Sequence, residues 1–407
     1  MASRSRWLLL GHLFLLTPAC GSDDSSDVAD SSSDTGGDEA SAEPDPSLCA
    51  AITVPVGEGP GAQVLELVAA REAIPGLAEQ PSTHGQILGT LFAFDGRVHL
   101  GYGDYSDNTG PIAMSAWDPS EAAFVDYGIL PTEEVLWFRP GVGTLYSPAA
   151  DPDGHQESGG IYRLDCGSEA WHVGTPIPGA VHVYDVARQG DTIYVGTGSL
   201  TGAPALLMAS QDHGESWTEV LRRESAADRF SRFYFVGATP EQLFVSGQDS
   251  PAPGTAFAWL RQGAGEFTPL LDPPAGLLVP IVLGDAMVIA AFSGNPGRGS
   301  YSSSYRIEGT SFVADAPWPQ LAGSDAELVV WSPDAEPERL LVLMRGADGR
   351  SSVQRTGDLA TFQELVSLDP LEAGDEFVSM ALLRNDLHLG TRLGSLYRLR
   401  ELDLPAP

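Results

Sequence analysis

The sequence predicts an all-β fold built from repeats, and three observations support this prediction. An aromatic residue returns about every 48 positions along most of the 407-residue chain, each time just after a short polar turn. The runs that flank these turns are short and rich in β-branched, aromatic and small residues, as half-buried strands are. The repeat period lies in the forties, which for β-type repeats is typical of the blades of a β-propeller. The repeating aromatic residues are Phe124, Trp171, Trp217, Phe267, Phe312 and Phe362.

Each repeat contains a second strand-like run that is the clearest of its four, and the sequence contains seven of these runs. They are Val98–Gly101, Thr144–Ser147, Ile193–Gly196, Leu243–Ser246, Met287–Ala290, Leu341–Met344 and Leu387–Gly390. The runs that precede them are more continuously apolar, as inner strands packed on both faces would be. The sequence therefore predicts a seven-bladed β-propeller rather than one of six or eight blades.

The last repeat lacks an obvious fourth strand. The repeating aromatic occurs six times, and no strand-like run follows Leu396–Leu399. A spare run, Val64–Leu67, precedes the first full repeat. Because an open ring would expose strand edges that promote aggregation, we expect the N-terminal strand to enter the last blade and close it.

The first residues have the composition of an export signal. Two arginines precede an apolar run of ten residues, which is too short to span a bilayer. The segment Leu16–Cys20 resembles a bacterial lipobox, although Thr17 stands where that motif usually has Leu. The resemblance implies that residues 1–19 are a lipoprotein signal peptide and that Cys20 carries the lipid. The alternative is an ordinary signal peptide cleaved after Ala19, with a free Cys20.

Residues 20–48 are expected to form an acidic, disordered tether. This segment contains nine acidic residues and no aromatic one, so it cannot bury enough apolar surface to fold. The functional interpretation is a spacer that lifts the domain off a lipid membrane, and the alternative is a leader without a role. Gly21 rather than Asp follows the cysteine, which favours the outer membrane, on its periplasmic or cell-surface side.

The charge of the chain excludes one class of partner. The sequence has 22 basic and 55 acidic residues, a formal net charge of −33. Nucleic acid is therefore not expected as a partner, because phosphate binding requires clustered cations. Residues 49–407 are predicted to form the propeller domain, as a monomer.

Two cysteines remain once Cys20 is assigned to the lipid. Cys49 lies where the tether ends, and Cys166 lies in the second repeat. In an oxidising compartment an even pair favours a disulfide, which would join the tether to the domain. The alternative is two buried thiols.

One turn in the third repeat has a defined motif. Ser210, Asp212, Gly214, Ser216 and Trp217 fill every defined position of the pattern S-x-D-x-G-x-[ST]-W. This pattern resembles the Asp-box, or BNR repeat, of propellers of the sialidase and sortilin type. Asp accepts backbone N–H bonds in the turn, Gly permits a positive φ, and Trp packs between sheets. The resemblance implies that these residues are structural rather than catalytic.

A sialidase-like enzyme would need an arginine triad for the substrate carboxylate, a Tyr–Glu nucleophile pair and an acidic proton donor. The nearest match to the first arginine motif of that family is Arg139, in the string Trp137–Pro140. The string lacks the usual Ile and lies in the second repeat. Arg139 is therefore the candidate substrate-binding residue, and its alternative is an ordinary arginine at the mouth of the ring.

No cofactor is expected, with calcium as the one open possibility. Asp151 and Asp153 offer oxygen ligands at short spacing, and the loop Asp104–Asn108 does the same. Neither has the full EF-hand pattern, so solvated loop acids are the alternative. The eight histidines form no HxH or HxxxH pair, which leaves zinc and copper without a predicted site.

These observations give three hypotheses for function. The first is a membrane-anchored envelope lipoprotein whose propeller binds a protein or glycan ligand without catalysis, at the face where the loops after the first and third strands converge. The second is a sialidase-like glycoside hydrolase. The third is a purely structural envelope protein. With 46 acidic residues in the domain, the two carboxylates that a glycosidase needs are not selected by sequence.

Overall fold

The computed structural model describes residues 64–152, 159–250, 255–293, 299–315, 318, 320–321, 324–325, 327–333 and 339–402. The chain divides into two compact units, Met1–Glu43 and Pro44–Pro407. The first unit, the expected signal peptide, Cys20, the tether and Cys49 all lie outside the described residues. Within the described ranges, no helix has the length and apolar character needed to cross a bilayer.

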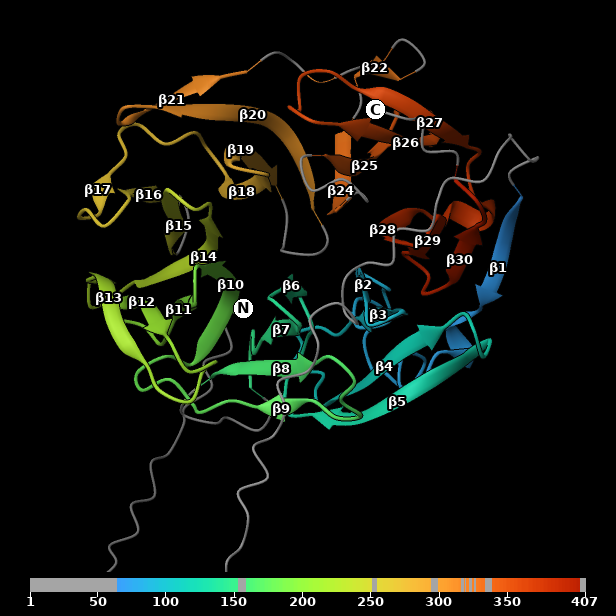
Figure 1. Ribbon diagram of the computed structural model, residues 1–407, viewed down its shortest axis with the longest axis horizontal. Coiled ribbons are helices and arrows are strands. Elements are labelled where there is room, and N and C mark those ends of the chain that lie inside the picture. The colour runs from blue at the N-terminus through green and yellow to red at the C-terminus, as the bar shows by residue number, and fades with distance from the viewer. Residues whose placement is uncertain are drawn as a thin grey trace, which may run out of the picture. The chain divides into compact units, whose positions relative to one another are not determined.

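The described strands pair into consecutive antiparallel groups of four, which follow one another around a ring (Figure 1). We call each group a blade, and its strands are given below in order from the first, innermost strand to the fourth, outermost one. The first blades are β2 (Thr90–Phe94), β3 (Arg97–Gly101), β4 (Ile112–Asp118) and β5 (Ala123–Leu130); β6 (Arg139–Pro140), β7 (Thr144–Pro148), β8 (Ile161–Asp165) and β9 (His172–Val173); β10 (His182–Gln189), β11 (Thr192–Gly198), β12 (Ala205–Ser210) and β13 (Thr218–Arg223); and β14 (Phe230–Ala238), β15 (Gln242–Ser250), β16 (Thr255–Gln262) and β17 (Thr268–Pro269).

The following blades are β18 (Leu277–Leu283), β19 (Ala286–Ser293), β20 (Ser300–Glu308) and β21 (Ser311–Ala314); β24 (Glu327–Pro333), β25 (Leu340–Arg345), β26 (Ser351–Thr356) and β27 (Gln363–Leu368); and β28 (Phe377–Leu383), β29 (Asp386–Thr391) and β30 (Leu396–Leu399) with β1 (Leu65–Ala69). A short hairpin, β22 (Gln320–Leu321) and β23 (Ser324–Asp325), and two 3₁₀ turns, η1 (Arg71–Ala73) and η2 (Glu372–Gly374), complete the described elements. Single residue pairs join β11 to β14 and β20 to β24.

The N-terminal strand β1 closes the last blade. It pairs antiparallel with β30, with Leu65 opposite Leu399. Glu66 lies opposite Arg398, and its carboxylate accepts a hydrogen bond from the Arg398 Nη2 at 2.9 Å. Hydrogen bonds from Arg398 and Arg400 lower the pKa of Glu66. This pairing confirms the expected closure, since β1 covers the third strand of the last blade as a fourth strand does elsewhere.

Apolar residues of neighbouring blades form the core between the sheets. Second strands contribute much of this core: every residue of β7 is buried, as are five of the six in β25. Packing across the join between the first and last blades is direct, because β2 contacts β28. There the Ser379 hydroxyl donates to the Leu88 carbonyl at 2.6 Å. Most residues of outer strands such as β5 are exposed or half-buried, which explains the weaker sequence signal of fourth strands.

One expected strand differs from its prediction. The run Val135–Phe138 was expected as the inner strand of its blade, but β6 consists only of Arg139–Pro140. The Val135 N–H instead donates to the carbonyl of Tyr102, at 2.9 Å, in the preceding blade. The apolar run is therefore a link between two blades, and the strand begins only after it.

The motif turn has the hydrogen bonds that its residue types predict. Asp212 Oδ1 accepts the Ser216 N–H at 2.9 Å, and its two carboxylate oxygens accept the hydroxyls of Ser210 and Ser216. These bonds lower the pKa of Asp212 to about 2. Gly214 has a φ of +95°, which permits the tight turn, and the Trp217 indole donates to the Thr175 carbonyl of the preceding blade. The turn thus fastens two blades together.

A shorter turn between β26 and β27 repeats this arrangement. Asp358 Oδ1 accepts the Thr361 N–H at 2.7 Å, and the Thr361 hydroxyl donates to the same carboxylate. Leu359 has a positive φ of +54°, a left-handed conformation that glycine adopts more readily than leucine. Cys166, in the turn between β8 and β9, is disulfide-bonded.

Candidate functional site at the mouth of the ring

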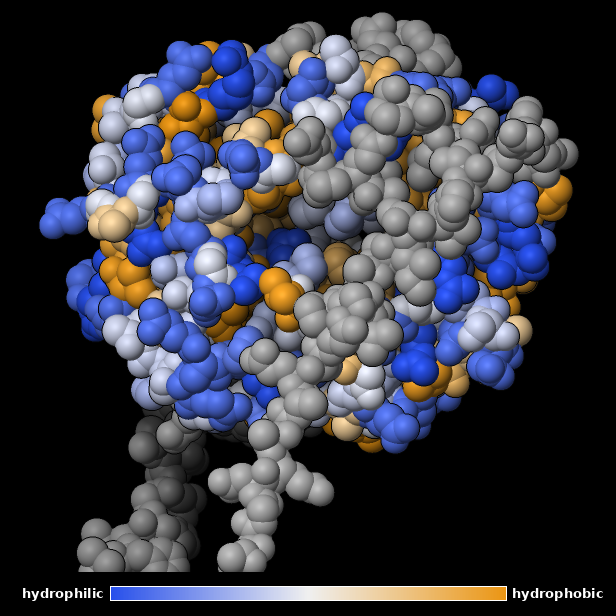
Figure 2. Space-filling view, in the orientation of Figure 1, coloured by the Kyte–Doolittle hydropathy of each residue, from blue (hydrophilic) through white to orange (hydrophobic). Residues whose placement is uncertain are grey.

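The repeated strand order gives the ring two different ends. At one end lie the links between blades and the loops between second and third strands; we call it the linker end. At the other lie the turns from first to second and from third to fourth strands, with the Asp212 turn among them; we call it the turn end. Hydrophilic residues predominate at the rim of the face drawn in Figure 2, in keeping with the acidic composition.

Three carboxylate residues lie on adjacent backbone segments at the linker end. Two isolated antiparallel bridges, Gly103–Glu134 and Thr132–Pro152, bring three backbone segments side by side, and Asp104, Glu133 and Asp151 lie next to these bridges. The Asp104 N–H donates to the Glu133 carbonyl at 2.9 Å, and the Glu133 N–H donates to the Asp151 carbonyl at 2.9 Å. A backbone N–H···O=C bond between neighbouring segments brings the Cα atoms of the two residues to about 5–6 Å. We call Asp104, Glu133 and Asp151 the acid row.

The members of the acid row differ in exposure. Asp104 is fully buried, and its Oδ2 accepts the Ser82 hydroxyl at 2.7 Å. Glu133 is buried as well, whereas the Asp151 side chain is 21% exposed. Asp151 Oδ2 lies 3.3 Å from His182 Nδ1, and the same nitrogen lies 3.0 Å from the carbonyl of Ala150. The row therefore ends in a carboxylate that solvent reaches and that an imidazole contacts.

Aromatic rings line the inner side of the acid row. The His182 ring stacks on Tyr184 at 5.6 Å between centroids, and Tyr184 contacts Tyr234 at 4.7 Å. The guanidinium of Arg232 lies 5.6 Å from the centre of the Tyr184 ring. Strands β10 and β14 each have a register shift at their tyrosine, and such bulges re-aim a side chain. Burial raises the pKa of Tyr184 well above its usual range.

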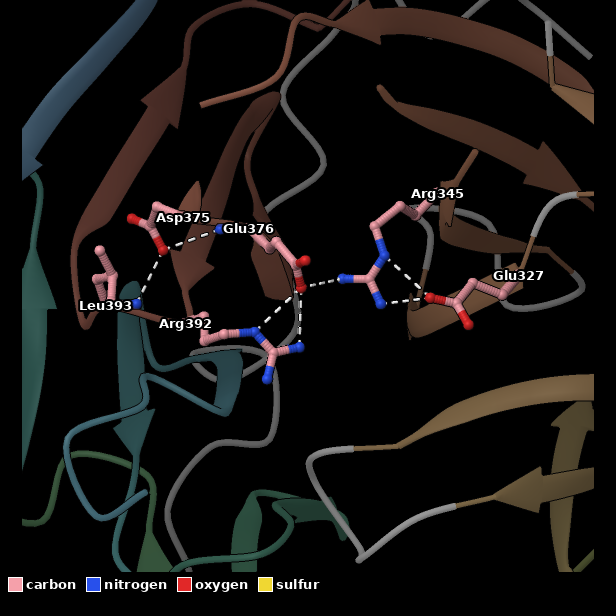
Figure 3. A network of polar contacts seen from close by, with 6 residues as sticks. All are labelled: Glu327, Arg345, Asp375, Glu376, Arg392 and Leu393. Atoms are coloured by element: carbon pink, nitrogen blue, oxygen red, sulfur yellow. Dashed lines mark hydrogen bonds and ion pairs between the residues drawn. The ribbon is translucent and has the colours of Figure 1, made fainter. Parts of the chain in front are cut away.

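A network of ion pairs connects two further blades at the linker end (Figure 3). Arg345, at the end of β25, donates to the carboxylates of Glu327 and Glu376, the latter at 2.6 Å. Arg392 also donates to Glu376, at 2.8 and 3.0 Å. Burial alone would raise the pKa of Glu327, but hydrogen bonds from Ser300 and Arg345 outweigh it and lower that pKa. The acids here are neutralised by arginine, unlike an acid pair poised for proton transfer.

A central cavity of about 390 Å³ lies inside the ring. Most of its lining residues come from the first strands β2, β6, β10, β14, β18, β24 and β28, and others, such as Phe292, Tyr301 and Leu340, come from β19, β20 and β25. Most of them are apolar or aromatic. Tyr301 is one of the few polar lining residues, and burial raises its pKa to about 12. The cavity is therefore a largely apolar space that the acid row does not line.

Arg139 lies in this cavity, held by an ion pair. Its Nε is 2.7 Å and its Nη2 3.3 Å from the carboxylate of Asp185, which is fully buried. The indole rings of Trp137 and Trp331 lie 5.2 and 5.9 Å from the guanidinium carbon. The structure thus places the candidate substrate-binding arginine in the central cavity rather than at the linker end, where the acid row lies.

The sialidase-type constellation is not assembled around Arg139. Arg188 and Arg339 line the same cavity, but the described lining residues include no glutamate that could pair with Tyr301. Asp151 belongs to the acid row, and Asp153 lies outside the described residues. In the part of the chain that the structure describes, no group of three or more His, Cys, Asp or Glu side chains is arranged to hold a metal ion.

Sequence reasoning missed Glu133 and His182. Glu133 lies in the link between β5 and β6, and His182 begins β10, so neither belongs to a motif. One signal was present, because the polar string Thr132–Glu134 comes directly before an apolar run, as a link between two blades would. Such links gather at one end of a propeller, so their polar residues can form a site there.

No family model and no curated protein matches the chain. Among solved structures it is similar to a GH74 enzyme of Niastella koreensis, with a TM-score of 0.50 and 11% identity over 84% of this chain and 55% of that one. The chain thus spans about half the length of that enzyme. It is also similar, at a TM-score of 0.40 and 14% identity over 63% of this chain and 89% of the other, to an α-L-arabinanase of Penicillium chrysogenum complexed with arabinobiose.

These comparisons show a β-propeller fold, and they correct the leading hypothesis for function. The expectation was a non-catalytic protein that binds a protein or glycan ligand in the envelope. The comparisons contradict its non-catalytic statement, because the similar structure with a TM-score of 0.50 is that of a GH74 enzyme. The alternative of a glycoside hydrolase agrees better with the findings. Sialidase-like specificity, which the Asp212 turn suggested, is not supported by them.

Proposed function

We propose that the chain is a glycoside hydrolase built on a seven-bladed β-propeller, with its catalytic carboxylates in the acid row. The observation that carries the proposal is the backbone hydrogen bond from the Glu133 N–H to the Asp151 carbonyl, at 2.9 Å, which brings these two acidic residues together. Glycosidases place two carboxyl groups about 5–10 Å apart on either side of the bond they cleave. Residues joined by such a backbone bond have Cα atoms about 5–6 Å apart, which is compatible with this separation of the carboxyl groups.

The surroundings of the pair fit work on a sugar. Asp151 is the member that solvent reaches, and His182 can donate a hydrogen bond to its ionised form. The half-buried ring of Tyr234 lies nearby, because the buried Tyr184 ring contacts both it and His182. We propose that Glu133 and Asp151 share the roles of proton donor and of base or nucleophile. Arg139, in the central cavity, has no part in this chemistry.

The test is hydrolysis by the purified chain of a panel of polysaccharides and aryl glycosides, arabinans and sialosides included, followed by release of reducing ends or of the aryl group. Loss of general acid–base catalysis typically costs 10²–10⁴-fold in rate, so Glu133→Gln and Asp151→Asn should each lower turnover at least about 100-fold. Asp191→Asn, at a fully exposed carboxylate of the turn end, is the matched control. Absence of hydrolysis across the panel, or equal activity in all three variants, would refute the proposal.

We further propose that the enzyme is a lipoprotein of the outer membrane, with Cys20 as the lipid attachment site and residues 20–48 as the tether. The lipobox-like segment and the acidic composition of the next residues support this. The Asp212 turn supports placing the chain near Asp-box propellers, as a structural likeness. Cys20→Ser should move the protein from the membrane to the soluble fraction and remove the mass of the lipid. Unchanged membrane fractionation would contradict the anchor.

A further inference from the structure

The central cavity differs in charge from the rest of the molecule. The chain has 55 acidic and 22 basic residues, yet the described lining of this cavity includes three arginines and no acidic residue: Arg139, Arg188 and Arg339. Asp185 lies behind Arg139, and two backbone N–H groups complete its hydrogen bonds. Cationic groups in a low-dielectric wall attract an anion more strongly than they would at the surface.

The rest of the lining selects a ligand with an apolar body. Trp137 and Trp331 flank Arg139, and aliphatic side chains such as Val236 and Val282 continue the wall. Few hydroxyl or amide groups face the space, so a polyhydroxylated sugar would leave many of its own polar groups without partners, which is costly. The chemistry of the cavity is therefore opposite to that expected of a glycan subsite.

We propose that this cavity is a second, non-catalytic ligand site, which takes a small carboxylic acid with an apolar body, of the class of medium-chain fatty acids. Arg139 Nε and Nη2 are bound to Asp185, whereas Nη1 has no hydrogen-bond partner among the described residues and donates to the ligand carboxylate. Arg188 lies on the neighbouring first strand. Its ion pair is with Asp191, whose side chain is fully exposed, so this pair is readily exchanged for the ligand.

The size of the cavity limits the ligand. A volume of about 390 Å³ is near the lower end of the ~300–1,000 Å³ range of small-molecule pockets. Each methylene buried contributes ~0.8 kcal/mol, or about fourfold in affinity. Affinity for saturated acids should thus rise with chain length and then fall once the chain no longer fits.

The experiment is titration of the full chain with decanoate, below its micelle concentration, by isothermal calorimetry, with decanol as the uncharged probe. Val282→Trp fills the cavity and should abolish decanoate binding, whereas Val173→Trp, at an exposed position of β9, should not. Arg188→Gln should weaken decanoate binding at least fivefold and leave decanol unchanged. Arg222→Gln, at a half-exposed arginine beyond the cavity lining, is its control.

Two results would overturn the proposal. One is absence of saturable binding for acids of six to twelve carbons in a chain whose unfolding is cooperative. The other is decanoate binding that Val282→Trp leaves unchanged, which would indicate adsorption elsewhere. The site does not depend on the hydrolase: Glu133→Gln should abolish hydrolysis and leave decanoate binding intact, so failure of either proposal is seen separately.

Discussion

Lowering the pH from 7.5 to 5.0 should destabilise the fold through two buried histidines. His99, on the second strand β3, is fully buried. The rings of Phe94, Tyr127, Phe138 and Trp171 surround it at centroid distances of 5.4 to 6.2 Å. This burial lowers the pKa of His99 from 6.5 to about 3.

The sign and size of the effect follow from proton linkage. The unfolded chain protonates this histidine below pH 6.5, whereas the folded chain does so only near pH 3. The contribution of His99 to the free energy of unfolding is therefore fully present above pH 6.5, and it is lost as the pH falls from 6.5 toward 3. At pH 5.0, about 1.5 units below the unfolded value, the loss is about 2 kcal/mol. His388, equally buried on β29 with a pKa lowered to about 4, loses a similar amount.

The assay is urea denaturation of the wild type and of His99→Leu at both pH values. Carboxylates also titrate in this range, so the informative quantity is the difference between the two proteins. His99→Leu should be less stable than the wild type at pH 7.5 because its packing changes, but its loss on going to pH 5.0 should be about 2 kcal/mol smaller. Equal pH dependence in His99→Leu and the wild type would refute the reasoning.

Three other perturbations test the packing and the polar contacts. Leu343→Ala, at a fully buried position of β25, should cost about 2–5 kcal/mol in urea denaturation, and a cost below 1 kcal/mol would mean that the blades are not tightly packed there. Arg345→Met removes donors from Glu376 and should cost about 1–3 kcal/mol; a neutral result would show the network to be dispensable. A carboxyl titration by NMR should find Asp212 near a pKa of 2, with its stabilising effect present above pH 4 and lost as the pH falls toward 2, whereas a normal pKa would contradict the turn geometry. Ser216→Ala should raise that pKa, because it removes one of the hydrogen bonds to the carboxylate.

Much of the strand order could be predicted from sequence because each strand has a local signature. The second strands are buried on both faces, so runs such as Leu341–Met344 are apolar throughout and their period is visible. The closing role of Val64–Leu67 followed from one missing fourth strand and one spare run. By contrast, Val135–Phe138 has the composition of an inner strand. Its first residue donates a hydrogen bond to the preceding blade, and the run forms a link between two blades instead of a strand.

The candidate site was less predictable because it is formed by two loops and one link between blades, and none of these segments contains a motif. Asp104, Glu133 and Asp151 are separated by 29 and 18 positions, and only the pairing of neighbouring blade loops brings them into one row. In a chain with so many acids, no local pattern distinguishes these three. Arg139 was selected by a motif fragment, but its place in the channel depends on Asp185, 46 residues further along the chain.

The pairing of β1 with β30 has a consequence for how the chain can be cut. Leu65 and Leu399 lie directly opposite each other, so the first and last strands meet as any two strands joined by a hairpin would. A short linker between them would make the domain a covalent circle, and new termini could then be opened in the link between β13 and β14. Such a circular permutant should keep every blade intact, because the closing pair is held by the same antiparallel pairing as the strands within the other blades.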